Sequence, residues 1–257
     1  RFSVIRQGEY MIKLTKKTTV EILSHAAEEA PNESCGFVVM QGQKQIYRPC
    51  DNVAARPSES FEIDAREWLS AANDGCEIVA VVHSHPEGGR YLSADDRRFH
   101  AGGDLPWLLV ADGEVYLYKP VPRLRGRVFV YGVADCSALL LDAYHLAGID
   151  LPDHARTDID ADAAAGYLLA HAAAVGLVQV FDDLQPGDVL LTSHRGQVSH
   201  VALYIGNGEI LHHAYDQLSR REPYGAYWRN QTHSVWRHPD FQPEMLQAIL
   251  NDLDWAL

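Results

Sequence analysis

The sequence predicts two mixed domains, an α/β/α sandwich followed by an α+β domain. Strands are expected to alternate with helices up to about residue 119, which is typical of a sheet with helices on its faces. Beyond residue 126, helices come first and an antiparallel sheet follows, which is the α+β order. Between them, KPVPRLRG has two prolines and three basic residues, a composition typical of linkers. We therefore expect domains at 1–119 and 127–257, joined by a linker at 120–126.

The first half begins with an amphipathic pattern at 16–33, which predicts a helix. Thr18 and Glu21 can form its capping box, and Pro31 stops it. The run EIVAVVH is almost continuously apolar, as in a strand buried on both faces. Before this strand, which spans 77–83, we expect strands at 35–40 and 44–50 and a helix at 64–74 capped by Asp64. After it, we expect a short helix at 93–103 and a hairpin at 107–119 with an Asp-Gly turn.

The second half contains two predicted helices, at 135–149 and in the Ala-rich stretch 161–176. Three strands are expected within 187–214, because the turn sequences HRGQ and GNGE divide it. The C-terminal stretch 243–257 carries a helical apolar face that either packs on the body, the interpretation we favour, or binds a partner; the face consists of Met245, Leu246, Ile249, Leu250 and Leu253. Whether residues 1–10 belong to the folded unit is left open.

Composition argues against several function classes. The net charge of -13 disfavours nucleic acid and anionic membranes, since both attract basic surfaces. No apolar run is long enough to predict a membrane span, and no signal-peptide pattern is found at the N-terminus. The four cysteines show no CxxC spacing, so we expect reduced thiols in a cytoplasmic product; they are Cys35, Cys50, Cys76 and Cys136.

The stretch VVHSHPEGGRYLSADD at 81–96 could form a metal site. His83 and His85 are two residues apart on a predicted strand, so both rings point to the same side. With Asp96 as third ligand, a zinc ion would keep an open position at which water can be activated. A carboxylate would still have to accept the proton, and Ser93 could stabilise an oxyanion. The alternative is a plain helix start, with Ser93 as the cap and Asp96 three residues later.

The combination of residues resembles the motif of JAMM (MPN-type) metalloproteases. His83-Ser84-His85-Pro86, then Ser93 and Asp96, match that motif without a gap, and NESCG supplies the upstream glutamate, Glu33. The resemblance covers about residues 11–119 and implies an α/β/α sandwich that cleaves amide or isopeptide bonds. It implies zinc bound by His83, His85 and Asp96, with Glu33 holding and deprotonating the water and Ser93 on the oxyanion. Its spacing favours Asp96 over Asp95 as the ligand, and Cys35 is expected to pack as a small apolar residue.

A second candidate site begins at Cys136, the predicted start of a helix. The helix N-terminus favours thiolate over thiol, so we expect the pKa of Cys136 to fall. His200 begins one strand and His212 ends the next, across a turn, so the two lie side by side and His212 can hydrogen-bond to the His200 ring. Such a cysteine, histidine and third polar group form a nucleophilic site. The alternative is an ordinary buried helix cysteine.

This half resembles the NlpC-type cysteine peptidases, which have a papain-like α+β fold and cut γ-D-glutamyl bonds in peptidoglycan stem peptides. The resemblance runs from about residue 126 to 215 and rests on DCS at 135–137, GD at 187–188 and HVALYIGNG at 200–208. It implies Cys136 as nucleophile, His200 as its partner and His212 as third polar residue. Two residues depart from the family pattern, Ala138 for glycine and Phe129 where many members have an active-site tyrosine. The rival histidines, His194 and His213, are expected to be solvated or to support the site.

Together, the two halves resemble phage tail-tip assembly proteins of the lambda type. The resemblance implies a protein made in the bacterial host cytoplasm, with other tail-tip proteins as partners and peptidoglycan stem peptide as substrate, which could reach the wall on the virion tail tip. One hypothesis is a bifunctional hydrolase, with a zinc protease and a cell-wall peptidase. The alternative is an assembly factor in which one or both sites serve maturation or docking. A scaffold with inert sites is the third, and the intact residue sets argue against it.

Overall fold

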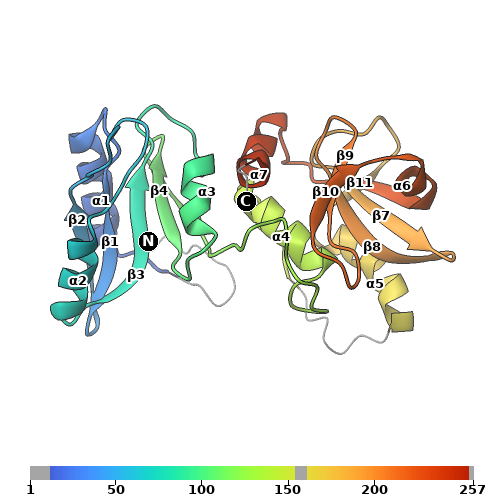
Figure 1. Ribbon diagram of the computed structural model, residues 1–257, viewed down its shortest axis with the longest axis horizontal. Coiled ribbons are helices and arrows are strands. Elements are labelled where there is room, and N and C mark those ends of the chain that lie inside the picture. The colour runs from blue at the N-terminus through green and yellow to red at the C-terminus, as the bar shows by residue number, and fades with distance from the viewer. Residues whose placement is uncertain (1–11, 154–160, 255–257) are drawn as a thin grey trace. The chain divides into compact units, whose positions relative to one another are not determined.

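A computed structural model describes residues 12–153 and 161–254 of the chain (Figure 1). The chain divides between Val121 and Pro122 into two compact units, each of which is described by itself. The expectations for residues 1–10 and for the last three residues of the C-terminal stretch lie outside the described part. Among the helices within that part, none has the length and apolar character needed to cross a membrane.

The first unit is built on a five-stranded sheet in the order β2-β1-β3-β4-β5. β3 and β4 run parallel, and the other neighbours are antiparallel. The strands are β1 (Cys35–Gln41), β2 (Lys44–Cys50), β3 (Glu77–Ser84), β4 (Trp107–Ala111) and β5 (Glu114–Tyr118). The helices are α1 (Lys16–Glu29), α2 (Ala65–Asn73) and α3 (Ala94–His100). The predicted elements of this half are thus confirmed to within a few residues.

Alternating residues of the central strands face opposite helices. Val38 and Val82 pack with Ile22 of α1 in one apolar cluster. Phe37 projects from the other face and packs edge-on against Trp68 of α2, with ring centroids 4.5 Å apart. Helices therefore cover both faces of the sheet, and the predicted α/β/α sandwich is confirmed.

The predicted cap of α1 is wrong. Thr15, not Thr18, is the N-cap, and its hydroxyl accepts a hydrogen bond from the backbone N–H of Thr18 at 3.1 Å. Thr18 lies one turn into the helix and is buried. The helix starts earlier because Thr15 has the extended backbone that an N-cap requires.

The second unit contains a six-stranded sheet in the order β10-β9-β8-β7-β11-β6. The three predicted strands are confirmed as β7 (Val189–His194), β8 (Gln197–Tyr204) and β9 (Glu209–His212). Three further strands were missed, namely β6 (Val178–Val180), β10 (Arg220–Pro223) and β11 (Thr232–Arg237). The helices are α4 (Cys136–Leu146), α5 (Ala161–Ala174), α6 (Ala226–Gln231) and α7 (Leu246–Leu253), with a 3-10 turn, η1, at Pro243–Met245. α4 and α5 both pack against β8, which confirms an α+β unit.

A buried ion pair ties the beginning of β7 to the end of β11. Arg237 donates to both carboxylate oxygens of Asp188, at 2.7 and 2.8 Å, and Asp188 is fully buried. The preceding Gly187 has φ +93°, and a Cβ at that position would lie 2.3 Å from the ring of Phe241. The GD pair therefore has a structural role: Asp188 binds Arg237, and Gly187 leaves room for the ring of Phe241 to pack against the backbone.

The C-terminal helix packs on the body of the second unit, as expected. Met245, Ile249 and Leu253 are buried. Asp252, also buried, accepts a hydrogen bond from the backbone N–H of Leu124 at 2.8 Å. The apolar face of α7 is therefore part of the core.

Candidate active sites

Side chains from β3 and α3 converge on one point of the first unit. The ligand atoms of His83, His85 and Asp96 all lie within 4.8 Å of one another. Oδ2 of Asp96 is 3.2 Å from Nε2 of His85 and 3.5 Å from Nε2 of His83. Asp95 is exposed and pairs with Arg98 instead, so Asp96 is the aspartate within reach.

The donor atoms of this cluster suit a metal ion. The ring of His83 is fully buried, yet neither of its nitrogens has a hydrogen-bond partner. Nδ1 of His85 lies 2.8 Å from the carbonyl oxygen of Gly89, which can only accept, so Nδ1 carries a proton, and in the neutral ring Nε2 keeps its lone pair. Nε2 and a carboxylate oxygen then point at each other as two acceptors, an arrangement that a shared cation satisfies.

Ser93 and Asp96 form the capping box that the sequence predicts as an alternative. The Ser93 hydroxyl accepts from the backbone N–H of Asp96 at 3.0 Å, and Asp96 Oδ2 accepts from the backbone N–H of Ser93 at 2.8 Å. The two interpretations are compatible, because a hydroxyl that accepts one bond still has a hydrogen to donate. The helix cap thus aims Asp96 at the two histidines.

Glu33 lies just before β1, beside the cluster. Its Oε1 is 3.9 Å from Nε2 of His85, and its Oε2 is buried without a partner. Burial raises the pKa of Glu33 to about 7, with His85 lowering it and Asp96 raising it. The neighbouring Ser34 is bound to Ser84 by its backbone N–H (2.8 Å to Ser84 Oγ) and its carbonyl (3.1 Å from Ser84 N), which ties the glutamate to the histidine strand.

Two aromatic rings enclose His83, and sequence reasoning missed both. Phe61 stacks on the imidazole with ring centroids 4.6 Å apart, and Trp107 packs edge-on at 5.3 Å. Burial lowers the pKa of His83, which favours the neutral form that binds a metal. Phe61 lies in the irregular segment between β2 and α2, where no periodic pattern marks a contact with the site.

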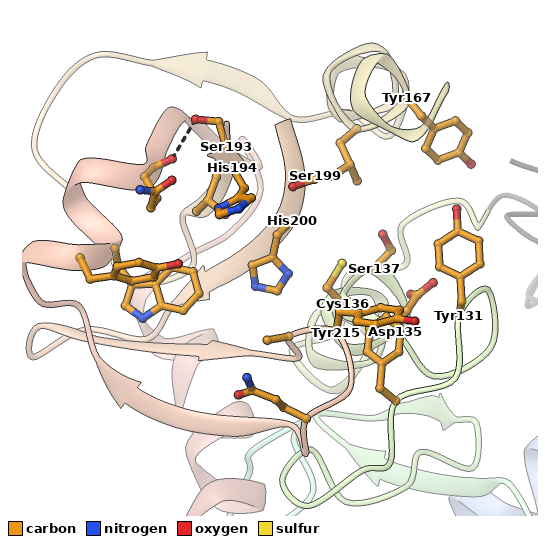
Figure 2. Close-up of a pocket in the computed structure, with 18 residues that line it drawn as sticks. Tyr131, Asp135, Cys136, Ser137, Tyr167, Ser193, His194, Ser199, His200 and Tyr215 are labelled. Atoms are coloured by element: carbon orange, nitrogen blue, oxygen red, sulfur yellow. Dashed lines mark hydrogen bonds between the residues drawn. The ribbon is translucent and has the colours of Figure 1, made fainter. Parts of the chain in front are cut away.

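The second site opens into a cavity of about 650 Å³ in the second unit. Cys136 is the first residue of α4, and its N-cap Asp135 accepts from the backbone N–H of Ala138 at 2.9 Å. His200 comes from β8, and both Cys136 and His200 line the cavity. Figure 2 shows the side chains of Cys136 and His200 both directed into this cavity.

The expected hydrogen bond between His200 and His212 is not formed. His212 pairs with Ala202, so it lies diagonally from His200, and the two rings pack at right angles with centroids 5.4 Å apart. Nε2 of His212 lies 3.0 Å from Oε1 of Glu222 instead, at ion-pair distance but without hydrogen-bond geometry, so both ring nitrogens of His212 are buried without a hydrogen-bond partner. The predicted register of the hairpin was offset by two residues.

The expected low pKa of the nucleophile is wrong as well. Burial raises the pKa of Cys136 to about 11, although backbone hydrogen bonding near Val201 lowers it. Burial and the neighbouring His212 and His213 lower the pKa of His200 to about 3. Desolvation therefore outweighs the helix terminus, which contributes only about 0.3–1 kcal/mol. The resting pair is a neutral thiol and a neutral imidazole.

The other histidines and cysteines are placed largely as expected. His194 is exposed at the edge of the cavity, and His213 is buried against Phe129, with ring centroids 5.2 Å apart. Cys35 and Cys50 are buried as packing residues. Glu222 and Trp228 were missed; Trp228 packs 4.7 Å from the His212 ring and donates its indole N–H to Glu222 at 2.5 Å.

The two units match two known domain families. Residues 15–122 match the model of prokaryotic homologs of the JAB domain, and residues 126–237 match the NlpC/P60 family. The chain thus joins two domains of hydrolase families. A desampylase of Haloferax volcanii is 37% identical over 87 residues, covering 30% of this chain and 63% of that protein.

Two phage proteins match along most of their length. Tail tip assembly protein K of Escherichia phage lambda is 47% identical over 189 residues, covering 73% of this chain and 94% of that protein. Tail tip assembly protein K of Escherichia phage N15 is 31% identical over 237 residues, covering 88% of this chain and 96% of that protein. The chain belongs to the tail tip assembly protein K family.

Proposed function

We propose that this family member is a bifunctional peptidase of the phage tail tip. The first unit would be a zinc-dependent peptidase or isopeptidase, and the second a cysteine endopeptidase that cuts peptidoglycan stem peptides. The observation that supports this most directly is the placement of Cys136 and His200 on one cavity, in a chain that also brings three metal-ligand side chains together. The protein would be made in the host cytoplasm, assemble with other tail-tip proteins and reach the wall on the virion.

In the first unit, His83, His85 and Asp96 would hold the zinc ion. When bound, zinc supplies Lewis acidity, which polarises a carbonyl and makes water more acidic. Glu33 faces the same point and would take the proton of the attacking water and pass it to the leaving amine. The Ser93 hydroxyl would donate its free hydrogen to the developing oxyanion.

In the second unit, the neutral pair requires proton transfer during attack. The Cys136 sulfur would bond to the carbonyl carbon while His200 takes the thiol proton, and His200 would then return that proton to the leaving nitrogen. A water molecule would next attack the thioester carbonyl and give one proton to His200, which returns it to the departing sulfur. The thiol is thereby regenerated, and the acid product loses its remaining proton to solvent to become a carboxylate. His212 would support the positively charged form of His200.

The cavity is lined mainly by aromatic and uncharged polar side chains. Among the described residues that line it there is no lysine or arginine, and its aromatic side chains include Tyr131, Tyr215 and Tyr227. The substrate would thus be held mainly through backbone hydrogen bonds and contacts with aromatic rings. A stem peptide running through such a groove can present one amide to Cys136.

Digestion of purified peptidoglycan tests the proposal. The wild-type protein should release shortened stem peptides, detected by mass spectrometry, and Cys136→Ala or His200→Ala should abolish release. His194→Ala is the matched control, because His194 lines the same cavity but is exposed at its edge. Unchanged release by Cys136→Ala would refute the cysteine half.

An assembly role without wall cleavage is the second candidate. The protonated resting state of Cys136 favours it, since a docking site needs no reactive thiolate. In that case the metal half would mature a tail partner, and Glu33→Gln would block tail assembly while zinc stays bound. Infectious phage carrying Cys136→Ala, with normal tails, would favour this candidate over wall cleavage.

A further inference from the structure

Glu222 contacts His212, and neither residue is among those that line the cavity. It belongs to β10, which pairs with β9, and its partner in the register is Ile210. Its Oε1 is 3.0 Å from Nε2 of His212 and accepts from Nε1 of Trp228 at 2.5 Å. Its Oε2 accepts from Nε of Arg220 at 2.8 Å. These donors lower the pKa of Glu222, although partial burial opposes them, so the side chain is a carboxylate at neutral pH.

The contact with Glu222 determines where His212 carries its proton. Burial lowers the pKa of His212 to about 4, so the neutral ring has only one N–H. A carboxylate can only accept, so at 3.0 Å it attracts an N–H on Nε2 and repels a lone pair there, although the contact does not yet have the angle of a hydrogen bond. The proton therefore belongs on Nε2. Nδ1 is left with a lone pair, and it is buried without a partner.

His200 lies within reach of that lone pair. The rings of His200 and His212 are 5.4 Å apart between centroids, close enough for a ring N–H to approach a ring nitrogen after a small rotation. When His200 takes the thiol proton, its ring has two N–H groups. Only one of them faces the sulfur of Cys136. The other needs an acceptor, because an unpaired cation in a buried position is costly.

We propose that Glu222 is a positioning residue of the cysteine site, which holds the proton of His212 on Nε2 and thereby presents Nδ1 as the acceptor for His200. The proposal rests on the proposed cysteine peptidase function. Trp228 supports the same arrangement, because its indole packs 4.7 Å from His212 and 5.7 Å from His200 while its N–H is bound to Glu222. Glu222 thus keeps the proton of His212 on Nε2 and also fixes the indole of Trp228, which packs against both histidines.

Nuclear magnetic resonance of the ¹⁵N-histidine-labelled full chain tests the tautomer without any substrate. His212→Gln identifies the signals of His212. The wild type should show a protonated Nε2 whose proton resonates at low field and is protected from exchange, and an unprotonated Nδ1. Glu222→Ala should lose that protected proton signal. A wild-type proton on Nδ1, or a protected Nε2–H that survives in Glu222→Ala, would overturn the proposal.

Glu209 provides the matched control. It lies on the same hairpin and accepts from Arg221 at 2.5 Å, as Glu222 does from Arg220, but it is not among the groups that contact His212. Glu209→Ala should leave the His212 signals unchanged. If Glu222→Ala does not fold, the tautomer of His212 in the wild type still tests the proposal.

Activity supplies an independent measurement. Glu222→Ala should lower kcat for stem-peptide cleavage by about ten- to a hundredfold with little change in KM, the size of effect seen when a partner that orients a metal-binding histidine is removed. An equal fall in Glu209→Ala would indicate a merely structural role and count against the proposal. If the wild type cleaves nothing, the proposed function fails, whereas the proton signal of His212 still tests the role of Glu222.

Discussion

Nε2 of His85 lies 3.2 Å from Oδ2 of Asp96, although one residue directly follows β3 and the other belongs to the first turn of α3. The capping box of α3 produces this proximity, because the backbone N–H of Ser93 binds the same Oδ2 atom. A local helix signal and a metal-ligand arrangement therefore depend on one carboxylate. Replacing Asp96 affects both the helix cap and the metal site, whereas the neighbouring Asp95 takes part in neither and serves as the control.

Asp96→Asn should lose zinc. The amide keeps an oxygen for the cap but removes the negative charge that a divalent ion needs, so zinc affinity should fall by at least about tenfold. Metal content by mass spectrometry after dialysis measures this. Asp95→Asn is the control, because Asp95 is exposed and paired with Arg98. Equal zinc in Asp96→Asn and wild type would exclude this aspartate as a ligand.

Ser84→Ala should destabilise the first unit. Its hydroxyl accepts from the buried backbone N–H of Ser34 at 2.8 Å and from the Ser34 hydroxyl at 3.1 Å. Leaving a buried donor unpaired costs about 1–3 kcal/mol. Ser34→Ala removes only the side-chain bond and keeps the backbone bond, so it should cost less. Urea unfolding of both variants measures the difference, and equal losses would contradict the assigned role of the backbone bond.

Gly187→Ala should destabilise the second unit more than Gly196→Ala. Both glycines have positive φ, which costs an alanine about 1–3 kcal/mol of strain. Only at Gly187 does an added Cβ meet a ring, that of Phe241 at 2.3 Å, and overpacking adds about 1–3 kcal/mol. Thermal unfolding of the two variants should therefore differ by several degrees. Similar midpoints would mean that the C-terminal segment moves to make room for the added methyl group without any loss of stability.

Burial of neutral His212 should make the second unit less stable in mild acid. Burial lowers the pKa of His212 to about 4, below its value in the unfolded chain. The unfolded state therefore binds more protons between about pH 6.5 and pH 4, and stability falls as the pH falls through that window. From pH 7 to pH 5 the loss should be about 2 kcal/mol, an upper value for this residue.

Urea unfolding at pH 7 and pH 5 measures this dependence. His212→Gln should show a smaller loss of unfolding free energy than the wild type over that interval. His194→Gln, which changes an exposed imidazole, should behave as the wild type does. A steeper loss in His212→Gln would mean that the folded state binds the His212 proton more tightly than the unfolded state.

The ligands of the metal cluster could be predicted from the sequence because they are local. His83, His85 and Asp96 lie within fourteen residues, on one strand and the helix that follows it. The rings behind them could not be predicted, since Phe61 reaches His83 from an irregular segment. Glu222 was missed because its contact depends on β10, a strand of four residues without an alternating pattern.

The pKa of Cys136 shows a different limit. A helix start is visible in the sequence, and its dipole favours the thiolate. The opposing cost of desolvation depends on how β8 packs over α4, which no local pattern reveals. The sequence therefore predicted the position of the nucleophile in the chain but not its protonation state.

The protonation state predicts how Cys136 reacts. A thiol with a pKa near 11 exposes little thiolate at pH 7, so alkylation by iodoacetamide should be slow there and rise about tenfold per pH unit up to about pH 10. Mass spectrometry of the peptide containing Cys136 gives the rate for this cysteine alone. His200→Ala should leave the profile nearly unchanged, because a neutral His200 contributes no charge that stabilises thiolate. A rate that already levels off near pH 7 in the wild type, and loses that plateau in His200→Ala, would instead demonstrate a thiolate–imidazolium pair, and attack would then begin without the coupled proton transfer derived above.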